Sequence, residues 1–171
     1  MNYSYIYESI VGKLLLESNG EFLTKLKFIL DEKPVVTNLN KEVFKETIDW
    51  LDLYFKGVNP EFTPKYKYTN KSSFALDVLE ITSKIPYGQT KTYGEIAKEV
   101  LVKRHMNNIS AQAVGGALNK NDICIIVPCH RVIGKNNNLV GFGGTIPKKI
   151  KLLEIEGNDM SNFYYKGIKN E

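Results

Sequence analysis

Apolar residues in the first thirty positions gather in three short runs separated by polar residues. Residues 3–7 and 11–16 have the tyrosine, isoleucine and leucine content typical of strands, and residues 22–30 form a third run. The Asn19-Gly20 pair before the third run favours a two-residue hairpin turn. We therefore predict an antiparallel meander of about three strands in this part of the chain.

Further along, the spacing of apolar residues changes to three and four, the period of an amphipathic helix. This helix is predicted to follow capping side chains at residues 38–41 and to end at Gly57, with apolar positions at Val43, Phe44, Ile48, Leu51, Tyr54 and Phe55. Residues 58–70 contain prolines and lack periodicity, which indicates a linker. The sequence thus predicts an N-terminal αβ support domain over residues 1–70, linker included, and a second domain over residues 71–171.

Helical patterns dominate the second domain. Ser72 or Ser73 and Thr92 are the predicted N-caps of two helices, and a third helix is predicted to start at Ser110. Glu95 stands three residues after Thr92, the spacing of a capping box. The helices that begin at Thr92 and Ser110 form a helix-turn-helix candidate. The predicted fold class is α+β, with a mainly helical C-terminal domain.

The second helix of this candidate, residues 110–118, has unusually small side chains. The adjacent Gly115 and Gly116 cost a helix about 2 kcal/mol relative to alanine, so some contact should require a bare surface. Close packing against another helix would explain the glycines. Close approach of a DNA backbone would explain them equally well.

Composition narrows the functional classes only a little. The chain has 171 residues, of which 43% are hydrophobic and 25% charged, so it suits one globular domain or two small ones. A net charge of +4 fits a polyanionic partner such as nucleic acid, and it fits a lysine-rich solvated surface as well. No apolar run approaches 18 residues, so we expect a soluble cytoplasmic protein with no membrane partner.

A thiol and an imidazole stand together at Cys129-His130, directly after the apolar run 123–127. Cysteine is often simply buried, but a thiolate made by a neighbouring imidazole is a recurring nucleophile. Successive residues of a strand point to opposite faces, so His130 serves Cys129 only if the chain bends there. Only Cys124 and His105 could join the pair as metal ligands, and no zinc spacing occurs, so no metal site is predicted.

Several motifs together resemble the O6-alkylguanine-DNA alkyltransferases, also called methylated-DNA-protein-cysteine methyltransferases. The matching segments lie between about residues 73 and 157, and they are Ile85-Pro86-Tyr87-Gly88, Thr92-Tyr93-Gly94-Glu95-Ile96-Ala97, Ala113-Val114-Gly115-Gly116-Ala117, Asn121, Pro128-Cys129-His130-Arg131-Val132, Gly143-Gly144 and Lys151-Leu152-Leu153-Glu154-Ile155-Glu156-Gly157. Residues 1–70 add only a compatible αβ shape.

The resemblance implies DNA repair by direct damage reversal. Cys129 would accept a methyl or other alkyl group from O6 of guanine, with O4 of thymine as a further candidate, and would keep it, so each molecule acts once without a cofactor. His130 would be the general base through a water, and Glu156 would orient it. Tyr93 would donate to guanine N3 and help rotate the nucleotide out of the duplex, while Asn121 would link the recognition helix to the cysteine turn.

The resemblance also implies how double-stranded DNA is bound. The second helix would enter the minor groove, with Gln112, Ala113 and Gly115 among its contacts. The guanine pocket would be formed by the backbone of Cys129 and by Val132, Phe142, Gly143 and Gly144, and Arg131 is a further candidate base contact. A monomer is expected.

Two departures from the family pattern stand out. Gln112 occupies a position where the family commonly carries an arginine that fills the space left by the flipped nucleotide. The segment 102–109 is also longer than the usual turn, and its Lys103-Arg104-His105 cluster could reach phosphates or remain a solvated basic loop.

Two other functions remain open from the sequence. Alkyltransferase-like proteins share the flipping apparatus but replace the acceptor cysteine and only bind lesions, and Cys129 argues against that class. A cysteine hydrolase would use the same Cys-His pair with repeated turnover.

Overall fold

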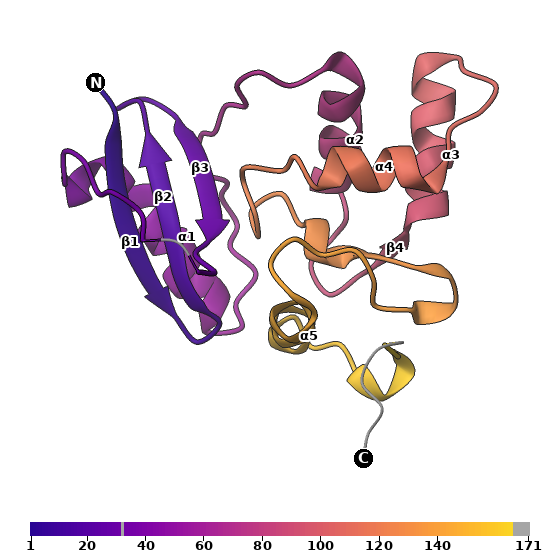
Figure 1. Ribbon diagram of the computed structural model, residues 1–171. Coiled ribbons are helices and arrows are strands. Elements are labelled where there is room, and N and C mark those ends of the chain that lie inside the picture. The colour runs from indigo at the N-terminus through magenta and orange to yellow at the C-terminus, as the bar shows by residue number, and fades with distance from the viewer. Residues whose placement is uncertain (32, 166–171) are drawn as a thin grey trace. The chain divides into compact units, whose positions relative to one another are not determined.

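The computed structural model describes residues 1–31 and 33–165, and Figure 1 shows its elements. The chain forms two compact units. The first contains Met1–Asn70 together with Asp122–Ile126, and the second contains Lys71–Asn121 and the chain from Val127 onward. The predicted boundary at residue 70 agrees with these units except for Asp122–Ile126, which the prediction placed in the second domain. Residues 166–171, which belong to the predicted second domain, lie outside the described residues.

The first unit is built on a three-stranded antiparallel sheet in the order β1-β2-β3. The strands are β1 (Tyr3–Ser9), β2 (Gly12–Ser18) and β3 (Leu23–Phe28). Their buried side chains include Leu14, Leu16, Leu23 and Leu26. The predicted meander and the α+β class are therefore confirmed.

The turn predicted at Asn19-Gly20 is wrong in its length. Ser18 pairs with Leu23, so four residues rather than two connect β2 and β3. The Asn19 side chain explains the wider loop, because its Oδ1 accepts from the backbone N–H groups of Glu21 and Phe22.

Helix α1 (Lys45–Phe55) supplies the rest of this core, and it follows a short 3-10 helix (Lys41–Phe44) capped by Asn40. Trp50 stacks on Tyr54 with ring centroids 5.3 Å apart. The segment predicted as a linker is partly attached to the sheet, because Leu23 N–H donates to Lys65 O and Lys67 N–H donates to Leu23 O, both at 2.9 Å.

Asp122–Ile126 joins the first unit by a short parallel bridge to β3. Leu26 N–H donates to Asp122 O at 2.7 Å, and Cys124 N–H donates to Leu26 O at 2.8 Å. The bridge ends after Cys124 because the chain turns sharply at Ile125, whose φ is +70°. Ile126 N–H donates to Cys124 O at 2.8 Å across this turn. This is a rare γ-turn and a strained conformation for a β-branched residue. The apolar run before Cys129 is therefore not an extended strand.

The second unit is mainly helical, as predicted. Its helices are α2 (Ser73–Ser83), α3 (Tyr93–Arg104), α4 (Ala111–Leu118) and α5 (Ile146–Ile155), and its two-residue strands β4 (Lys91–Thr92) and β5 (Val132–Ile133) pair in parallel. The side chains of Ser72, Thr92 and Ser110 cap α2, α3 and α4, and Thr92 with Glu95 completes the capping box.

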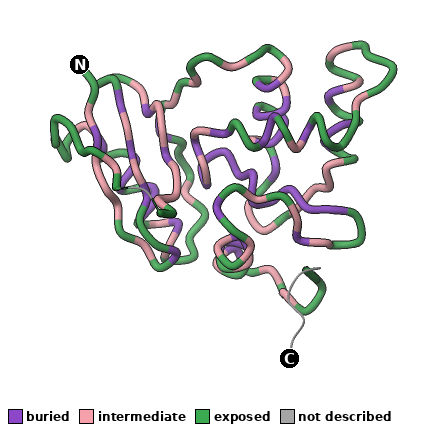
Figure 2. Tube along the Cα trace, in the orientation of Figure 1, coloured by how far each residue is buried: buried purple, intermediate pink, exposed green. Residues whose placement is uncertain are grey.

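Buried residues form an unbroken run from residue 125 to residue 134, which Figure 2 shows as a continuous purple segment. The run contains the Cys129-His130 pair, so the candidate chemistry lies inside the protein rather than on an exposed loop. Within the described part of the chain, no helix is long and apolar enough to cross a membrane.

Candidate active site

Cys129 lies at the start of a tight turn, so the chain bends directly after the apolar run. Cys129 N–H donates to Val127 O at 2.9 Å around Pro128, and Cys129–Arg131 then form a single 3-10 turn. The Asn121 amide, itself buried, donates to Val127 O at 3.0 Å. Asn121 thus fastens the main chain two residues before the cysteine, the position that the predicted linking role needs.

His130 and Glu156 form a fully buried pair. His130 Nε2 lies 2.6 Å from Glu156 Oε1, and neither side chain is exposed. Glu156 is the C-cap of α5, and Gly157 follows in the left-handed region with φ +85°, so the helix ends with its last carboxylate directed at the turn. The structure therefore brings together two of the residues predicted to act on Cys129.

Arg131 corrects one prediction. Its guanidinium is buried and holds both Glu156 oxygens, from Nε to Oε2 and from Nη2 to Oε1 at 2.9 Å each. Nη1 donates to Ile85 O at 2.7 Å, and the group lies 5.7 Å from the centre of the Tyr87 ring. These contacts commit the guanidinium to the interior, so the expected contact with a DNA base is wrong and Arg131 serves to position Glu156.

The charges of this cluster suit an imidazole that accepts a proton. Burial lowers the pKa of His130 below its usual value, which keeps the ring neutral. Burial opposes ionisation of Glu156, but His130 and Arg131 outweigh it and lower the pKa of the carboxyl to about 2. A neutral imidazole beside a carboxylate is the arrangement that a general base needs near neutral pH.

Tyr93, the first residue of α3, reaches the loop after β5. Its hydroxyl lies within hydrogen-bond distance of two loop carbonyls, Val140 O at 3.0 Å and Gly141 O at 2.9 Å. Burial, together with the charge of a Cys129 thiolate, raises the pKa of Tyr93 to about 12, so the hydroxyl remains a donor. Gly141 has φ +65°, and a Cβ there would come within 2.5 Å of the hydroxyl oxygen. The close approach of Tyr93 therefore requires glycine at residue 141.

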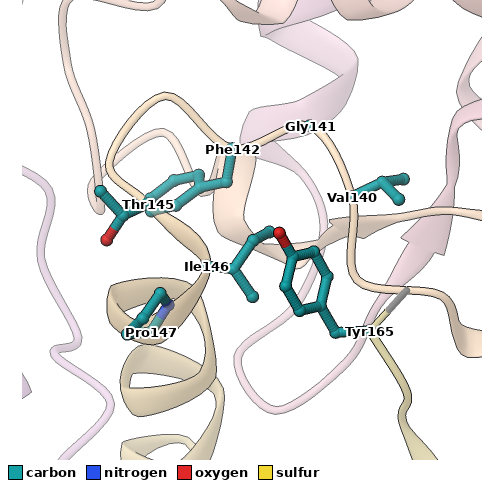
Figure 3. Close-up of a pocket in the computed structure, with 7 residues that line it drawn as sticks. All are labelled: Val140, Gly141, Phe142, Thr145, Ile146, Pro147 and Tyr165. Carbon is teal, nitrogen blue, oxygen red and sulfur yellow. The ribbon is translucent and has the colours of Figure 1, made fainter. Parts of the chain in front are cut away.

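A cavity of about 580 Å³ lies beside this loop. Figure 3 shows its lining, which comes from the loop, the first turn of α5 and the segment before the described end, and which consists of Val140, Gly141, Phe142, Thr145, Ile146, Pro147 and Tyr165. Of the residues predicted to form the guanine pocket, Phe142 lines this cavity. Val132 is fully buried in β5, Gly144 is buried, and Gly143 is exposed with open space where a Cβ would lie.

Helix α4 presents the small surface that the sequence suggested. Gln112 and Ala113 are exposed in its first turn, and Gly115 faces Tyr93, whose Cε1 would lie 3.9 Å from an added Cβ. A Cβ on Gly116 would meet nothing within 4 Å. Packing against another described helix therefore does not explain Gly116.

The basic cluster at the end of α3 is engaged with α2. Lys103 binds Asp77 at 2.9 Å and also contacts Glu80, while Arg104 Nη1 donates to Asp77 at 2.6 Å. These pairs neutralise both cations and support the contact between α2 and α3. They favour a structural role for Lys103 and Arg104 over contact with phosphates.

Sequence reasoning missed Lys149, which is completely buried on α5. Its ammonium donates to Val132 O and, at 3.1 Å, to Val140 O. Burial lowers the pKa of Lys149 to about 8, and the charge of a Cys129 thiolate opposes this shift. Its position seven residues before Glu156 puts both on one helix face, and that spacing is the signal that could have revealed it.

Known proteins of similar sequence and structure are methylated-DNA–protein-cysteine methyltransferases. The chain is 38% identical to a methylated-DNA–protein-cysteine methyltransferase of Methanosarcina acetivorans over 91% of this chain and 99% of the relative. A Haemophilus influenzae protein of the same name is 35% identical, with 90% and 85% covered. The crystal structure of Mycobacterium tuberculosis O6-methylguanine methyltransferase matches with a TM-score of 0.80 and 35% identity, covering 91% and 93%.

The same mycobacterial protein in complex with DNA matches with a TM-score of 0.78, 35% identity and 92% of each chain covered. These matches define a DNA-repair enzyme that transfers a methyl group to a cysteine. Residues 73–158 match the DNA-binding domain of 6-O-methylguanine DNA methyltransferase, and residues 1–65 match its ribonuclease-like domain. The chain therefore belongs to the 6-O-methylguanine DNA methyltransferase family.

Proposed function

We propose that this protein transfers a methyl or other alkyl group from O6 of guanine in double-stranded DNA to Cys129, once and irreversibly. The observation that carries the proposal is the buried pair of His130 and Glu156, 2.6 Å apart, in which His130 directly follows Cys129 in the same 3-10 turn. The mycobacterial relative crystallised with DNA supports the substrate class.

Beyond the protein and the damaged base, the proposed transfer uses one water. The thiol proton passes through a water to His130; because Glu156 holds Nε2, Nδ1 is the accepting nitrogen in this proposal. The thiolate forms a bond to the alkyl carbon, the bond from that carbon to O6 breaks, and its electron pair remains on the base. Guanine takes up a proton and is restored, while Cys129 becomes a stable thioether.

Delivery of the base is also part of the proposal. The alkyl carbon is inaccessible in stacked DNA, so the nucleotide must rotate out, at a cost of a few kcal/mol. Helix α4 would enter the minor groove with Gln112, Ala113 and Gly115 in contact, and the open space at Gly116 supports this. The Tyr93 hydroxyl would release the loop carbonyls and donate to guanine N3 instead. The protein is expected to act as a monomer, and its cytoplasmic location stays a prediction.

Intact mass after incubation with a duplex containing O6-methylguanine tests the function directly. We expect a gain of one methyl group per protein, abolished in Cys129→Ser and retained in Cys124→Ser. No gain in the parent protein would refute the transfer. A parallel duplex with O4-methylthymine tests the second substrate.

The same stoichiometry separates the two alternatives. A lesion-binding protein without an acceptor would retain the duplex and gain no mass, whereas a hydrolase would turn over many substrates per molecule. Cys129 disfavours the first alternative, and a thioether product disfavours the second, because water does not cleave it.

Replacing Gln112 with arginine is expected to increase DNA affinity or transfer rate about tenfold. Gln112 is exposed on α4, and an added cation there would provide a charge-assisted hydrogen bond worth roughly 1.4 kcal/mol more. Single-turnover kinetics over a range of duplex concentrations measure both quantities. Asn59→Arg adds the same charge to an exposed residue of the first unit and serves as control. Equal constants for Gln112→Arg and the parent would reject a limiting role for residue 112.

A further inference from the structure

The segment between α2 and β4 contains a tight turn that reaches the carboxylate side of the site. Gln89 N–H donates to Pro86 O at 3.1 Å, so the segment is a β-turn, and its third residue, Gly88, has φ +76°. A positive φ at this place is typical of a type II turn and favours glycine. The turn takes no part in the proton transfer proposed above, yet it contacts both Arg131 and Glu156.

Tyr87, the second residue of the turn, contacts both partners of the buried ion pair. Its hydroxyl donates to Ile155 O at 3.2 Å, one residue before Glu156. The centre of its ring lies 5.7 Å from the Arg131 guanidinium, within the range of a cation–π interaction. Burial, and then the charge of Glu156, raises the pKa of Tyr87, so the hydroxyl keeps its proton and remains a donor. Tyr87 therefore acts on the guanidinium directly and on the carboxylate through the neighbouring main chain.

Gly88 approaches Glu156 at both the side chain and the main chain. Its N–H donates at 3.4 Å to Glu156 Oε2, the oxygen that also accepts from Arg131 Nε. A Cβ on residue 88 would lie 3.1 Å from Glu156 O, which is closer than an ordinary van der Waals contact. The absence of a side chain at residue 88 therefore lets the turn pack directly against Glu156.

The place of Glu156 in its helix explains why such a support matters. Glu156 is the C-cap of α5, where the regular hydrogen bonding of the helix ends, so the helix alone does not fix its side chain. The residue before the turn adds a further contact, since Ile85 O accepts from Arg131 Nη1 at 2.7 Å. His130 Nε2 lies only 2.6 Å from Glu156 Oε1, so even a small displacement of the carboxylate changes that hydrogen bond.

We propose that Tyr87 and Gly88 are positioning residues for alkyl transfer, which hold Glu156 and Arg131 in place and thereby set the hydrogen bond between Glu156 and His130. They act on the reaction through Glu156. The inference rests on the proposed function, in which Glu156 orients His130 as the general base for Cys129.

Two substitutions disturb the contact in different ways. Tyr87→Phe removes only the hydroxyl that donates to Ile155 O and keeps the ring, whereas Gly88→Ala pushes the Glu156 main chain by a few tenths of an ångström. A misplacement of about 1 Å can cost a site about a hundredfold in rate. We therefore expect single-turnover methyl transfer to fall about fivefold in Tyr87→Phe and about tenfold in Gly88→Ala.

The hydrogen bond itself is observed by proton NMR in the absence of DNA. A short hydrogen bond from an imidazole N–H to a carboxylate moves its proton resonance to low field. The chain contains two histidines, so a His105→Gln variant assigns the resonance of His130. We expect the His130 Nε2–H resonance to move to higher field in both variants, because the hydrogen bond to Glu156 becomes longer.

Matched controls make the same chemical changes in the first unit. Tyr7→Phe removes a hydroxyl that donates to Asp52 at 2.7 Å. Gly20→Ala adds a methyl group at φ +98°, where a Cβ would meet Tyr3 at an ordinary 3.4 Å. Both controls should keep the transfer rate and the His130 resonance of the parent. Urea unfolding identifies any loss that comes from misfolding, and Tyr87→Phe, which adds no atom, keeps the test valid if Gly88→Ala does not fold.

The two readouts together decide the inference. A His130 resonance that stays unchanged in both variants would overturn it even if the rate falls, and so would a shifted resonance with the parent's rate. A change in one variant alone would confine the role to that residue and remove it from the other. A parent protein that gains no methyl group refutes the proposed function instead, and this failure is distinguishable because the resonance is measured without DNA.

Discussion

Replacing Glu156 with glutamine is expected to lower the single-turnover rate of methyl transfer by about two orders of magnitude or more. The carboxylate accepts from His130 Nε2 at 2.6 Å and from two Arg131 nitrogens at 2.9 Å. A glutamine keeps one acceptor oxygen and turns an amide donor toward one of these donors, so the protonated imidazole loses its stabilising anion. Intact mass at successive times, with duplex in excess, measures the rate.

The same substitution is expected to reduce the free energy of unfolding by about 3 kcal/mol, because it leaves the Arg131 guanidinium buried against a neutral group. The Glu156 pKa falls from 4.5 to about 2 on folding. Its stabilisation is therefore present above pH 4.5 and is lost as pH falls toward 2. Urea unfolding at pH 7 and pH 3 should show the difference between parent and variant narrowing at the lower pH.

Glu154→Gln is the control for both measurements. Its carboxylate is exposed on the same helix, and its ion pair with Lys151, at 3.6 Å, contributes little to stability. It should change neither the rate nor the stability appreciably. Transfer by Glu156→Gln at the parent rate would show that the carboxylate is not needed to orient or balance His130.

Alanine at residue 141 is the second substitution with a large expected effect. Gly141 has φ +65°, and an added Cβ would lie 2.5 Å from Tyr93 Oη and 3.3 Å from Cζ. The left-handed conformation costs an alanine roughly 1–2 kcal/mol, and the overlap with the ring adds about 1–3 kcal/mol. We expect a loss of about 3 kcal/mol in unfolding free energy, with a transfer rate reduced at least tenfold because Tyr93 is displaced.

Gly143→Ala tests whether the effect is specific, because it lies in the same loop and a Cβ there would have nothing within 4 Å. Its stability should stay within about 0.5 kcal/mol of the parent. Urea unfolding of both variants provides the comparison. Similar behaviour of the two alanine variants would mean that Tyr93 does not depend on its close contact with residue 141.

Features encoded by neighbouring residues could be predicted from the sequence. The capping box of Thr92 and Glu95 needs only side chains and backbone three residues apart, and the N-cap of α4 at Ser110 is equally local. The strands of the meander follow from composition and short connections. The order of the motifs indicated Cys129, His130 and Glu156 as one cluster, although the distance between His130 and Glu156 needed the fold.

Contacts between distant residues were beyond sequence reasoning. The family resemblance suggested Arg131 as a base contact, yet its guanidinium binds Glu156, which lies 25 residues away. Lys149 could not be distinguished from the other lysines of α5, because nothing local shows that the Val132 carbonyl accepts from it. The run before Cys129 resembled a strand, and only its pairing with β3 reveals the sharp turn at Ile125.

Because residues 122–126 belong to the first unit, the protein cannot be cut at residue 70 without separating parts of one core. Ile123 and Ile125 are completely buried, and both belong to the first unit although they lie within six residues of the acceptor. Deleting the first 70 residues would strip these isoleucines of their packing and leave an apolar, aggregation-prone segment beside the cysteine. The two halves therefore suit fragment complementation, in which activity returns only when both are supplied, better than use of the C-terminal half as an independent module.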